Sequence, residues 1–157
     1  MTSASHGQRE TVTKDFKRRV LFVCIHNAAR SQIAEAFLNR LGGRYFAAES
    51  AGLEPTEINP LVVEAMREIG IDLSGAVARS VFDLFKKGEK YSWVVTVCDE
   101  ANQRCPLFPG HARRIHWSFE DPASFDGSHE EKLEKTRKLR DEIKSKVEEF
   151  VREFEAT

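Results

Sequence analysis

The stretch VLFVCIHNAARS at residues 20–31 decides the fold of this chain. Its first four residues form a continuous apolar run, which is typical of a buried strand in a parallel sheet. After this stretch, apolar residues recur on one face of a helix, at Ile33, Phe37, Leu38 and Leu41. We expect Gly42 and Gly43 to end this helix through a left-handed cap. The stretch therefore predicts a strand, a loop and a helix in direct succession.

The rest of the chain alternates between short strands and helices. Further strands are predicted at residues 45–48, 93–97 and 114–117. Helices are predicted between Asn59-Pro60 and Gly70, over residues 80–85, and from the capping box of Ser128 and Glu131 onward. This order predicts a single α/β domain over residues 18–157, with a mainly parallel four-stranded sheet and helices on both faces.

Chemistry-bearing residues follow three of the predicted strands. Cys24 ends the first strand, Cys98 ends the strand at 93–97, and a polar segment follows Trp117. The carboxyl ends of parallel strands meet at one edge of a sheet, where α/β proteins bind their ligands. We therefore expect these three points to converge.

Composition and charge exclude several classes of protein. The chain has 157 residues with 41% hydrophobic and 31% charged residues, as in an ordinary globular domain. Its net charge of -1 gives no field that would attract nucleic acid or a membrane surface, so any anion site must be local. No apolar run approaches the roughly 20 residues that cross a bilayer. Residues 1–17 are polar and are expected to form a flexible tail.

The predicted location is the cytoplasm, which bears on the three cysteines, Cys24, Cys98 and Cys105. In a reducing compartment a structural disulfide is not expected. These thiols are therefore either inert core residues or chemically active groups.

The loop after the first strand has the features of an oxyanion site. Backbone N–H groups before a helix lack helical partners, and the helix dipole adds a partial positive charge. Arg30, six residues after Cys24, can offer a planar fork to a tetrahedral oxyanion, and Ser31 can donate a hydrogen bond to the sulfur. These surroundings stabilise a thiolate that can attack phosphorus or arsenic. The predicted site comprises Cys24, Ile25, His26, Asn27, Ala28, Ala29, Arg30 and Ser31.

Cys98 and Cys105 form a second candidate site, a pair of cysteines seven positions apart. A disulfide needs Cα atoms within about 7 Å, so a helix between them could not bring these thiols together. A segment that loops or unwinds could do so. The alternative is two unrelated cysteines, one of them buried at the strand end.

Several motifs resemble the low-molecular-weight tyrosine phosphatase superfamily, which includes the thioredoxin-coupled arsenate reductases. They follow the family order and cover nearly the whole chain after residue 18: residues 24–36, Glu49-Ser50-Ala51-Gly52, Asn59-Pro60, Asp72-Leu73-Ser74 and Asp121-Pro122. The phosphatases usually carry glycine at the position of His26, and histidine there resembles some arsenate reductases. Val95-Thr96-Val97-Cys98 and Cys105-Pro106 also resemble the reductases. The resemblance implies the phosphatase-like fold and arsenate reduction with thioredoxin as electron donor.

The resemblance also implies a role for each cysteine. Cys24 attacks arsenate, Cys98 attacks the Cys24 sulfur as arsenite leaves, and Cys105 then attacks Cys98 to free Cys24. Reduction of arsenate takes two electrons, which two thiols supply by forming a disulfide. No metal or flavin is required by this scheme.

Three further assignments follow from the resemblance. Asp121 would protonate the leaving oxygen, with Glu120 as the rival acid and a simple Asp-Pro turn as the structural alternative. A potassium site in the reductases resembles the set Asn27, Glu35, Ser50 and Asp72. The spacing of His26, His111 and His116 matches no zinc motif.

Two other functions remain open from the sequence. A low-molecular-weight protein tyrosine phosphatase would share the loop at Cys24 but would not need Cys98 and Cys105. A non-enzymatic thiol sensor or oxyanion-binding regulator would show no turnover with a reducing system.

Overall fold

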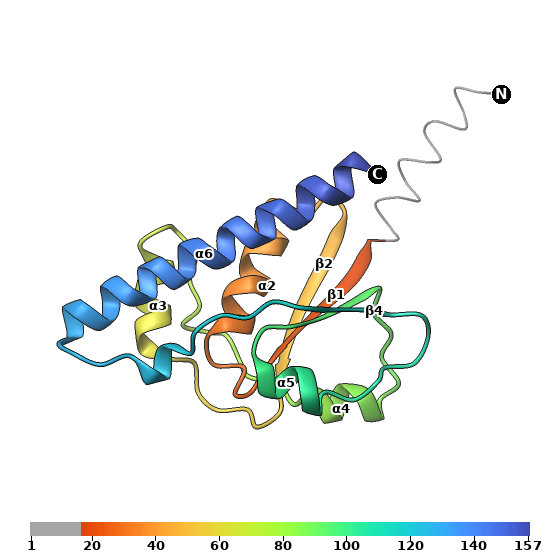
Figure 1. Cartoon of the computed structure of the whole chain (residues 1–157), viewed down its shortest axis with the longest axis horizontal. Coiled ribbons are helices and arrows are strands. Elements are labelled where there is room, and N and C mark those ends of the chain that lie inside the picture. The colour runs from red at the N-terminus through yellow and green to blue at the C-terminus, as the bar shows by residue number, and fades with distance from the viewer. Residues whose placement is uncertain (1–16) are drawn as a thin grey trace.

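The computed structural model describes residues 17–157, so the tail expected at 1–17 lies, apart from Lys17, outside the described residues. Four strands form one sheet: β1 (Arg18–Cys24), β2 (Phe46–Gly52), β3 (Trp93–Thr96) and β4 (Arg113–His116). Their order is β2-β1-β3-β4, and every neighbouring pair is parallel (Figure 1). The predicted four-stranded parallel sheet is confirmed.

Within residues 17–157, five helices and one 3₁₀ turn connect and flank these strands. They are α2 (Arg30–Leu41), α3 (Pro60–Arg67), α4 (Val81–Lys86), α5 (Asp99–Arg104), the turn η1 (Pro122–Ser124) and α6 (His129–Ala156). Asn59 caps α3 by accepting from the Leu61 N–H at 2.9 Å, and Ser128 and Glu131 form the predicted capping box of α6. Among residues 17–157, no helix is both long and apolar enough to cross a membrane.

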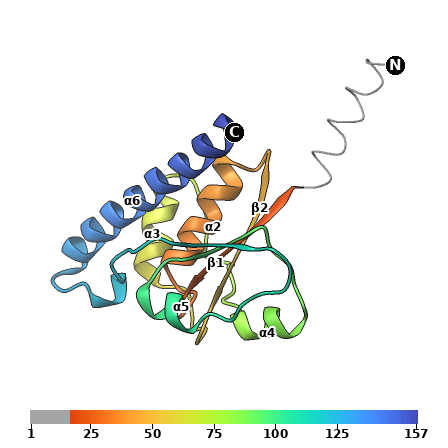
Figure 2. The ribbon, with the colours of Figure 1, turned by 45° about the vertical axis from the view of Figure 1, so that its right-hand side comes forward.

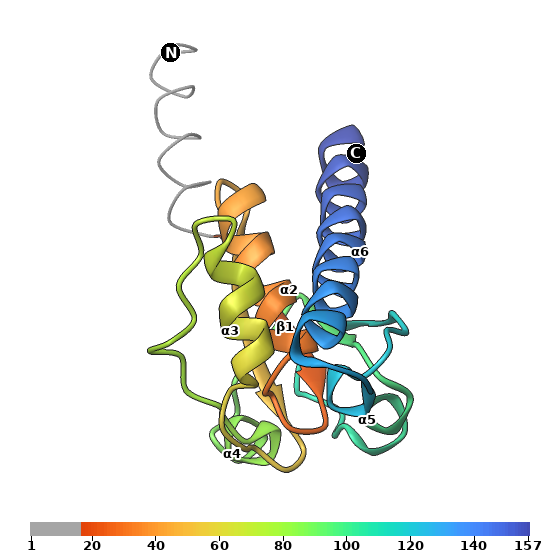
Figure 3. The ribbon, with the colours of Figure 1, turned by 90° about the vertical axis from the view of Figure 1, so that its left-hand side faces the viewer.

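Helices cover both faces of the sheet, as predicted. Phe46 of β2 packs against Phe150 and Phe154 of α6, with ring centroids 5.2 and 4.9 Å away. Glu49, three positions further along β2, points to the opposite face. There Glu49 accepts from Tyr91, whose ring packs on Phe108, and Phe108 contacts Phe85 of α4. Figures 2 and 3 show α2, α3 and α6 grouped together and α4 apart from them.

The glycine pair after α2 corrects one expectation. Neither Gly42 nor Gly43 has a positive φ, and Gly42 has φ −121°, so the left-handed cap is wrong. A Cβ on Gly42 would lie 2.9 Å from Val151 of α6 and 3.0 Å from Leu38. A larger residue here would have to displace side chains of α2, β2 and α6, a close approach that a sequence pattern does not show.

α5 is an element that the sequence did not predict. Its six residues, DEANQR, carry no apolar stripe, and only Ala101 is buried. The helix occupies the segment between Cys98 and Cys105 and therefore decides how far apart these two thiols lie. Other bounds differ by a few residues at most: for example, β4 covers Arg113–His116, and α3 ends at Arg67.

Candidate active site

Cys24 is the last residue of β1, and Arg30 is the first residue of α2. The loop between them lies at the carboxyl edge of the sheet, where β1 has β2 on one side and β3 on the other. Cys24 is 2% exposed and Arg30 is 6% exposed. The strand and the helix thus hold a thiol and a guanidinium at the same buried edge.

The backbone carbonyls of residues 25–29 all accept hydrogen bonds from groups outside the loop. Those of Ile25, His26 and Ala28 accept from the backbone N–H groups of Glu54, Thr56 and Asn59, at 2.7, 3.0 and 2.9 Å. The Ala29 carbonyl accepts the first bond of α2, and Gln32 donates to the Asn27 carbonyl at 3.1 Å. The N–H groups at the amino end of α2 are thereby available to an anion, as in other helix-terminal oxyanion sites.

The Cys24 sulfur receives two hydrogen-bonding groups. The Asn27 backbone N–H donates to it at 3.2 Å, and the Ser31 hydroxyl lies 2.8 Å from it. The Asn27 side-chain amide donates to the Ser31 oxygen at 2.8 Å, so the Ser31 proton is directed toward the sulfur. Both contacts fix the position of the sulfur at the start of the loop.

Asn27 is the centre of this loop. Its φ of 53° lies in the left-handed region, which asparagine tolerates better than most residues. Its side-chain oxygen accepts from the Arg79 backbone N–H at 2.9 Å and from Gln32 Nε2 at 3.1 Å. A Cβ at Gly52 would come within 2.7 Å of the Asn27 nitrogen, so β2 needs glycine beside the loop.

Arg30 and Asp121 meet across the pocket. Arg30 Nη1 donates to the Phe119 carbonyl at 3.1 Å, and Nη2 lies 3.5 Å from Asp121 Oδ2. Asp121 is anchored in turn, because its other oxygen accepts from the Ala123 N–H at 2.9 Å. Asp121 lines the same pocket as Cys24 and Arg30, whereas Glu120 lines a different one.

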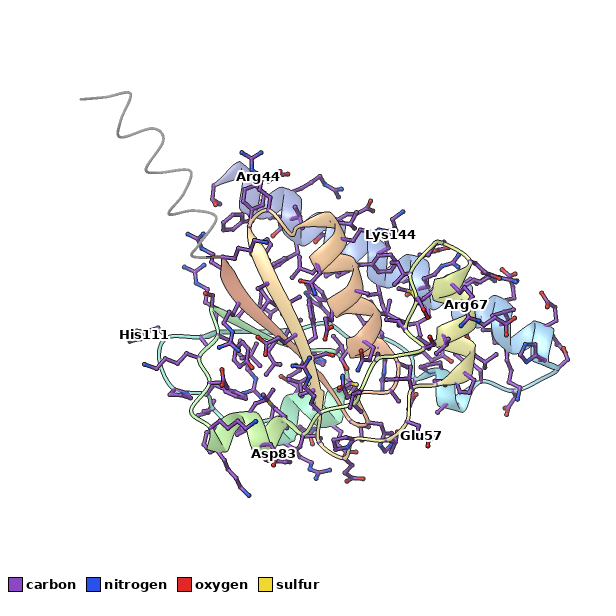
Figure 4. The ribbon with its side chains drawn as sticks, turned by 180° about the vertical axis from the view of Figure 1, so that it is seen from behind. Arg44, Glu57, Arg67, Asp83, His111 and Lys144 are labelled. Carbon is purple, nitrogen blue, oxygen red and sulfur yellow. The ribbon has the colours of Figure 1, made fainter. Side chains whose placement is uncertain are left out.

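The pocket above Cys24 is bounded by the loop, the segment at 56–60 and η1. Its other lining residues are His26, Ala28, Ala29, Thr56, Glu57, Ile58, Asn59, Pro60 and Ala123. His26 Nδ1 donates to the Glu54 carbonyl at 2.9 Å, which fixes the ring at the rim. Figure 4 shows His111 on the opposite side of the molecule from Glu57, which lines the same pocket as His26.

Cys98 lies two residues after the end of β3, the strand that pairs with β1. Its sulfur caps α5 by accepting from the Ala101 N–H at 3.4 Å. Burial raises the pKa of the Cys98 thiol, whereas the Ala101 N–H and the nearby Arg30 charge lower it. These influences place Cys98 in the electrostatic field of the Cys24 loop.

Cys105 stands at the other end of α5. It is buried, and burial raises the pKa of its thiol to about 11, while the Arg114 charge opposes this shift. An α-helix rises 1.5 Å per residue, so seven positions correspond to roughly 10 Å along the axis. This exceeds the Cα separation of a disulfide, about 7 Å at most. In the folded helix, Cys98 and Cys105 are free thiols kept apart.

The four residues of the expected potassium set are only partly brought together. Ser50 donates to Glu35 at 2.6 Å, and burial raises the pKa of the Glu35 carboxyl. Asn27 belongs to the loop described above. Asp72 has a side chain that is 71% exposed, and its carboxylate accepts from the Ser74 N–H and lies 4.0 Å from Arg67.

Sequence reasoning missed three residues that support the loop: Gln32, Arg79 and Gly52 act through Asn27. Gln32 and Gly52 lie within the family motifs at residues 24–36 and 49–52, but the sequence assigned them no role. Arg79 could not be found from its residue type, because it acts through its backbone N–H.

The family model for low molecular weight phosphotyrosine protein phosphatase matches residues 19–157. The chain belongs to this family. A curated relative is the arsenate reductase of Shouchella clausii, which is 39% identical over 139 residues and covers 85% of this chain and 95% of that protein. These residues include nearly all of the described domain.

Two solved structures of arsenate reductases are also similar. The enzyme from Archaeoglobus fulgidus has a TM-score of 0.67 and 32% identity, covering 84% of this chain and 98% of that one. A thioredoxin-dependent arsenate reductase from Corynebacterium glutamicum has a TM-score of 0.66 and 25% identity, covering 98% of this chain and 70% of that one. The family fold and its helix-bearing parallel sheet are thus shared along the chain.

Proposed function

We propose that this protein is an arsenate reductase that uses Cys24, Cys98 and Cys105 in turn and receives its electrons from thioredoxin. The observation that carries the proposal is the position of Cys98, which follows the strand next to Cys24 and caps the helix that ends at Cys105. A phosphatase does not need these two thiols, whereas this chain carries one after the strand next to β1 and another at the end of α5. The relatives named arsenate reductase support the same conclusion.

The loop performs the first step. Arsenate binds at the amino end of α2 between the N–H groups and the Arg30 fork, and the Cys24 thiolate attacks arsenic. The bond from arsenic to one oxygen breaks, and that oxygen leaves as water after accepting protons. Asp121, at the pocket wall beside Arg30, supplies a proton to it.

The next two steps are thiol–disulfide chemistry. The Cys98 thiolate attacks the Cys24 sulfur, and the electron pair of the sulfur–arsenic bond leaves with arsenic as arsenite. Cys105 then attacks Cys98, and Cys24 departs as a thiolate. The two electrons come from thiols, so this sequence uses no redox cofactor, and thioredoxin restores the final disulfide to two thiols.

The last step requires α5 to unwind. Cys98 and Cys105 bracket its six residues, and their spacing in a helix exceeds what a disulfide spans. The helix is short and its outward side is polar, so its loss exposes little apolar surface. The resulting disulfide becomes accessible to an external dithiol, and a reducing cytoplasm is the compartment in which this cycle operates.

The test is oxidation of NADPH in the presence of arsenate, thioredoxin and thioredoxin reductase. Continuous turnover that stops when thioredoxin is omitted is the expected result. The Cys24→Ser variant serves as control and should be inactive, because a hydroxyl is not ionised by this loop. No turnover by the wild-type protein, with intact aryl-phosphate hydrolysis, would contradict the proposal.

That last outcome would favour the second candidate, a low-molecular-weight tyrosine phosphatase. The family match and the pairing of Asp121 with the Cys24–Arg30 pocket favour it. The two functions separate by their dependence on Cys98 and Cys105, because a phosphatase keeps its rate when both are replaced.

We also propose a potassium site at Glu35 and Ser50, close to the active-site loop. Glu35 is half-buried, and burial raises the pKa of its carboxyl, a penalty that a bound cation would relieve. Carboxylate and hydroxyl oxygens suit a hard cation. Asp72 would have to leave Arg67 to join this site.

Potassium binding predicts a selective gain in thermal stability. The melting temperature should rise by a few degrees in potassium chloride over choline chloride at equal ionic strength, because a ligand that binds only the native state stabilises it. Glu35→Gln should abolish this rise, whereas Glu57→Gln, an exposed control, should preserve it. Equal melting temperatures in both salts would contradict potassium binding.

A further inference from the structure

Two side chains of β4 reach across to α5. Arg114 Nη2 donates to the Asn102 carbonyl at 3.1 Å and to the Cys105 carbonyl at 3.2 Å. Its Nη1 lies 3.5 Å from the Pro106 carbonyl. Carbonyls at the end of a helix lack intrahelical partners, and a cationic side chain satisfies them and favours the helix dipole. Arg114 is therefore the carboxyl-terminal cap of α5.

His116 holds the opposite end of the same helix. Its Nε2 lies 3.0 Å from Asp99 Oδ1, in the first residue of α5, and its Nδ1 lies 2.9 Å from Thr96 Oγ1. Thr96 also donates to Asn102 Oδ1 at 3.2 Å. Arg114 and His116 are two positions apart on β4, so the pleat directs both side chains to one face.

These contacts depend on the helical form of α5. Arg114 can reach the Asn102 and Cys105 carbonyls together because the last turn of the helix brings them close. A Cys98–Cys105 disulfide pulls the two ends of the segment together and removes that spacing. The contacts thus stabilise the dithiol form and are lost, at least in part, in the disulfide form.

We propose that Arg114 and His116 are positioning residues that hold α5 helical and thereby set the reduction potential of the Cys98–Cys105 pair. An interaction present only in the dithiol form shifts the equilibrium toward the dithiol, which makes the disulfide a better acceptor of electrons from thioredoxin. The same contacts keep Cys105 buried and away from Cys98 until Cys24 has reacted. This inference rests on the proposed function, because it assumes that the two thiols form a disulfide.

The experiment measures the equilibrium between dithiol and disulfide directly. Cys24→Ser is the background, because with three cysteines in the chain it leaves only Cys98 and Cys105 to pair. The protein is titrated in oxidised and reduced dithiothreitol buffers, and thiols are counted by alkylation and mass spectrometry. Arg114→Gln should shift the equilibrium constant about tenfold toward the disulfide, which corresponds to a potential about 30 mV lower. His116→Asn should shift it in the same direction.

The matched control is Arg113→Gln, which removes the same charge from the adjacent position of β4. Among the described residues, no side-chain hydrogen bond joins Arg113 to α5, so its equilibrium should stay within twofold of the background. Hydrogen exchange of residues 98–106 in the dithiol form should quicken for Arg114→Gln and not for Arg113→Gln. Arg114→Lys should recover part of the shift, because an ammonium still donates to carbonyls.

The possible failures are distinguishable. If the background protein forms no Cys98–Cys105 disulfide, the three-thiol relay of the proposed function is wrong and the positioning role falls with it. If the disulfide forms but Arg114→Gln and Arg113→Gln titrate alike, the relay stands and the positioning role is overturned. Should Arg114→Gln fail to fold, the His116→Asn titration decides the question in the same way.

Discussion

Arg30 is oriented before any anion binds. The residue is 6% exposed, and its guanidinium is fixed by the Phe119 carbonyl on one nitrogen and Asp121 beside the other. A planar fork held in this way can bind two oxyanion oxygens at once, which a point charge cannot do. We therefore expect Arg30→Lys to lower kcat/KM for both arsenate and aryl phosphates by about 100-fold.

The control for this change is Arg40→Lys, on the same helix. Arg40 is exposed and donates to the Ile69 carbonyl, away from the pocket. Steady-state kinetics of the two variants should differ by about two orders of magnitude. Equal kinetics for Arg30→Lys and the wild-type protein would remove Arg30 from the oxyanion site.

Asp121 and Glu120 are adjacent carboxylates with different surroundings. Asp121 lines the Cys24 pocket, whereas Glu120 is exposed and lines a separate pocket beside α6. If Asp121 protonates the leaving oxygen, Asp121→Asn should slow hydrolysis of phenyl phosphate by about 100-fold or more. p-Nitrophenyl phosphate, with a better leaving group, should suffer less.

Glu120→Gln is the matched control and should hydrolyse both esters at the wild-type rate. The measurement is the ratio of the two rates for each variant. A similar loss on both esters for Asp121→Asn would indicate that Asp121 only positions Arg30.

For single residues, the sequence predicts the groups that react or bind the anion better than the residues that hold those groups in place. Cys24 and Arg30 are recognisable because their types and spacing carry the chemistry. Gln32 and Arg79 are not, because they act through Asn27 at sites set by the fold, and Arg79 does so through its backbone N–H. Gly52 likewise depends on the approach of β2 to the loop.

Among the secondary-structure elements, α5 lies between Cys98 and Cys105, and we expect these two thiols to act in different steps. Replacing either with serine should stop multiple turnover with arsenate and thioredoxin, while aryl-phosphate hydrolysis by Cys24 continues. The two variants should stall at different points. Without Cys98, no internal thiol resolves the arsenic adduct, whereas without Cys105 one arsenite per enzyme is released and a Cys24–Cys98 disulfide accumulates.

The measurement is single-turnover arsenite release from the reduced protein, followed by peptide mapping of disulfides. A Cys105→Ser variant that turns over continuously would show that an external thiol resolves Cys98. A wild-type rate for both variants would instead support the phosphatase assignment.

The helices themselves were predictable to different degrees. α3 and α6 carry capping residues and apolar stripes, so their starts follow from local signals. α5 lacks such a stripe, and its side-chain contacts come from residues of other elements such as Arg114 and His116. Tertiary contacts of this kind cannot be predicted from the local sequence of a helix.

In the molecule as a whole, the topology follows from the alternation of strands and helices. Parallel strands with crossovers on both faces bring the ends of β1 and β3 to one edge, which is why Cys24 and Cys98 lie at the same edge of the sheet. The order of the four strands was not predicted, because it depends on which face each crossover takes.

Burial of Cys105 also links the redox site to the stability of the whole fold. The pKa of this thiol rises from an ordinary value of 9.0 to about 11, so the folded state holds the proton more tightly than the unfolded chain. The resulting stabilisation is complete below about pH 9 and is lost as the pH rises toward 11, where the folded thiol also ionises. Each pH unit in this window removes about 1.4 kcal/mol at most.

We therefore expect the free energy of unfolding of the wild-type protein to fall more steeply than that of Cys105→Ala above pH 9. The difference between the two curves should shrink by about 1 kcal/mol between pH 9 and pH 10. Urea unfolding with a phosphine reductant, at several pH values, measures it. Buried Tyr91 and Cys98 have raised pKa values too, but both are present in the two proteins and their effects cancel. Parallel curves across this range would mean that Cys105 ionises as readily in the fold as in the unfolded chain, and that α5 does not shield it.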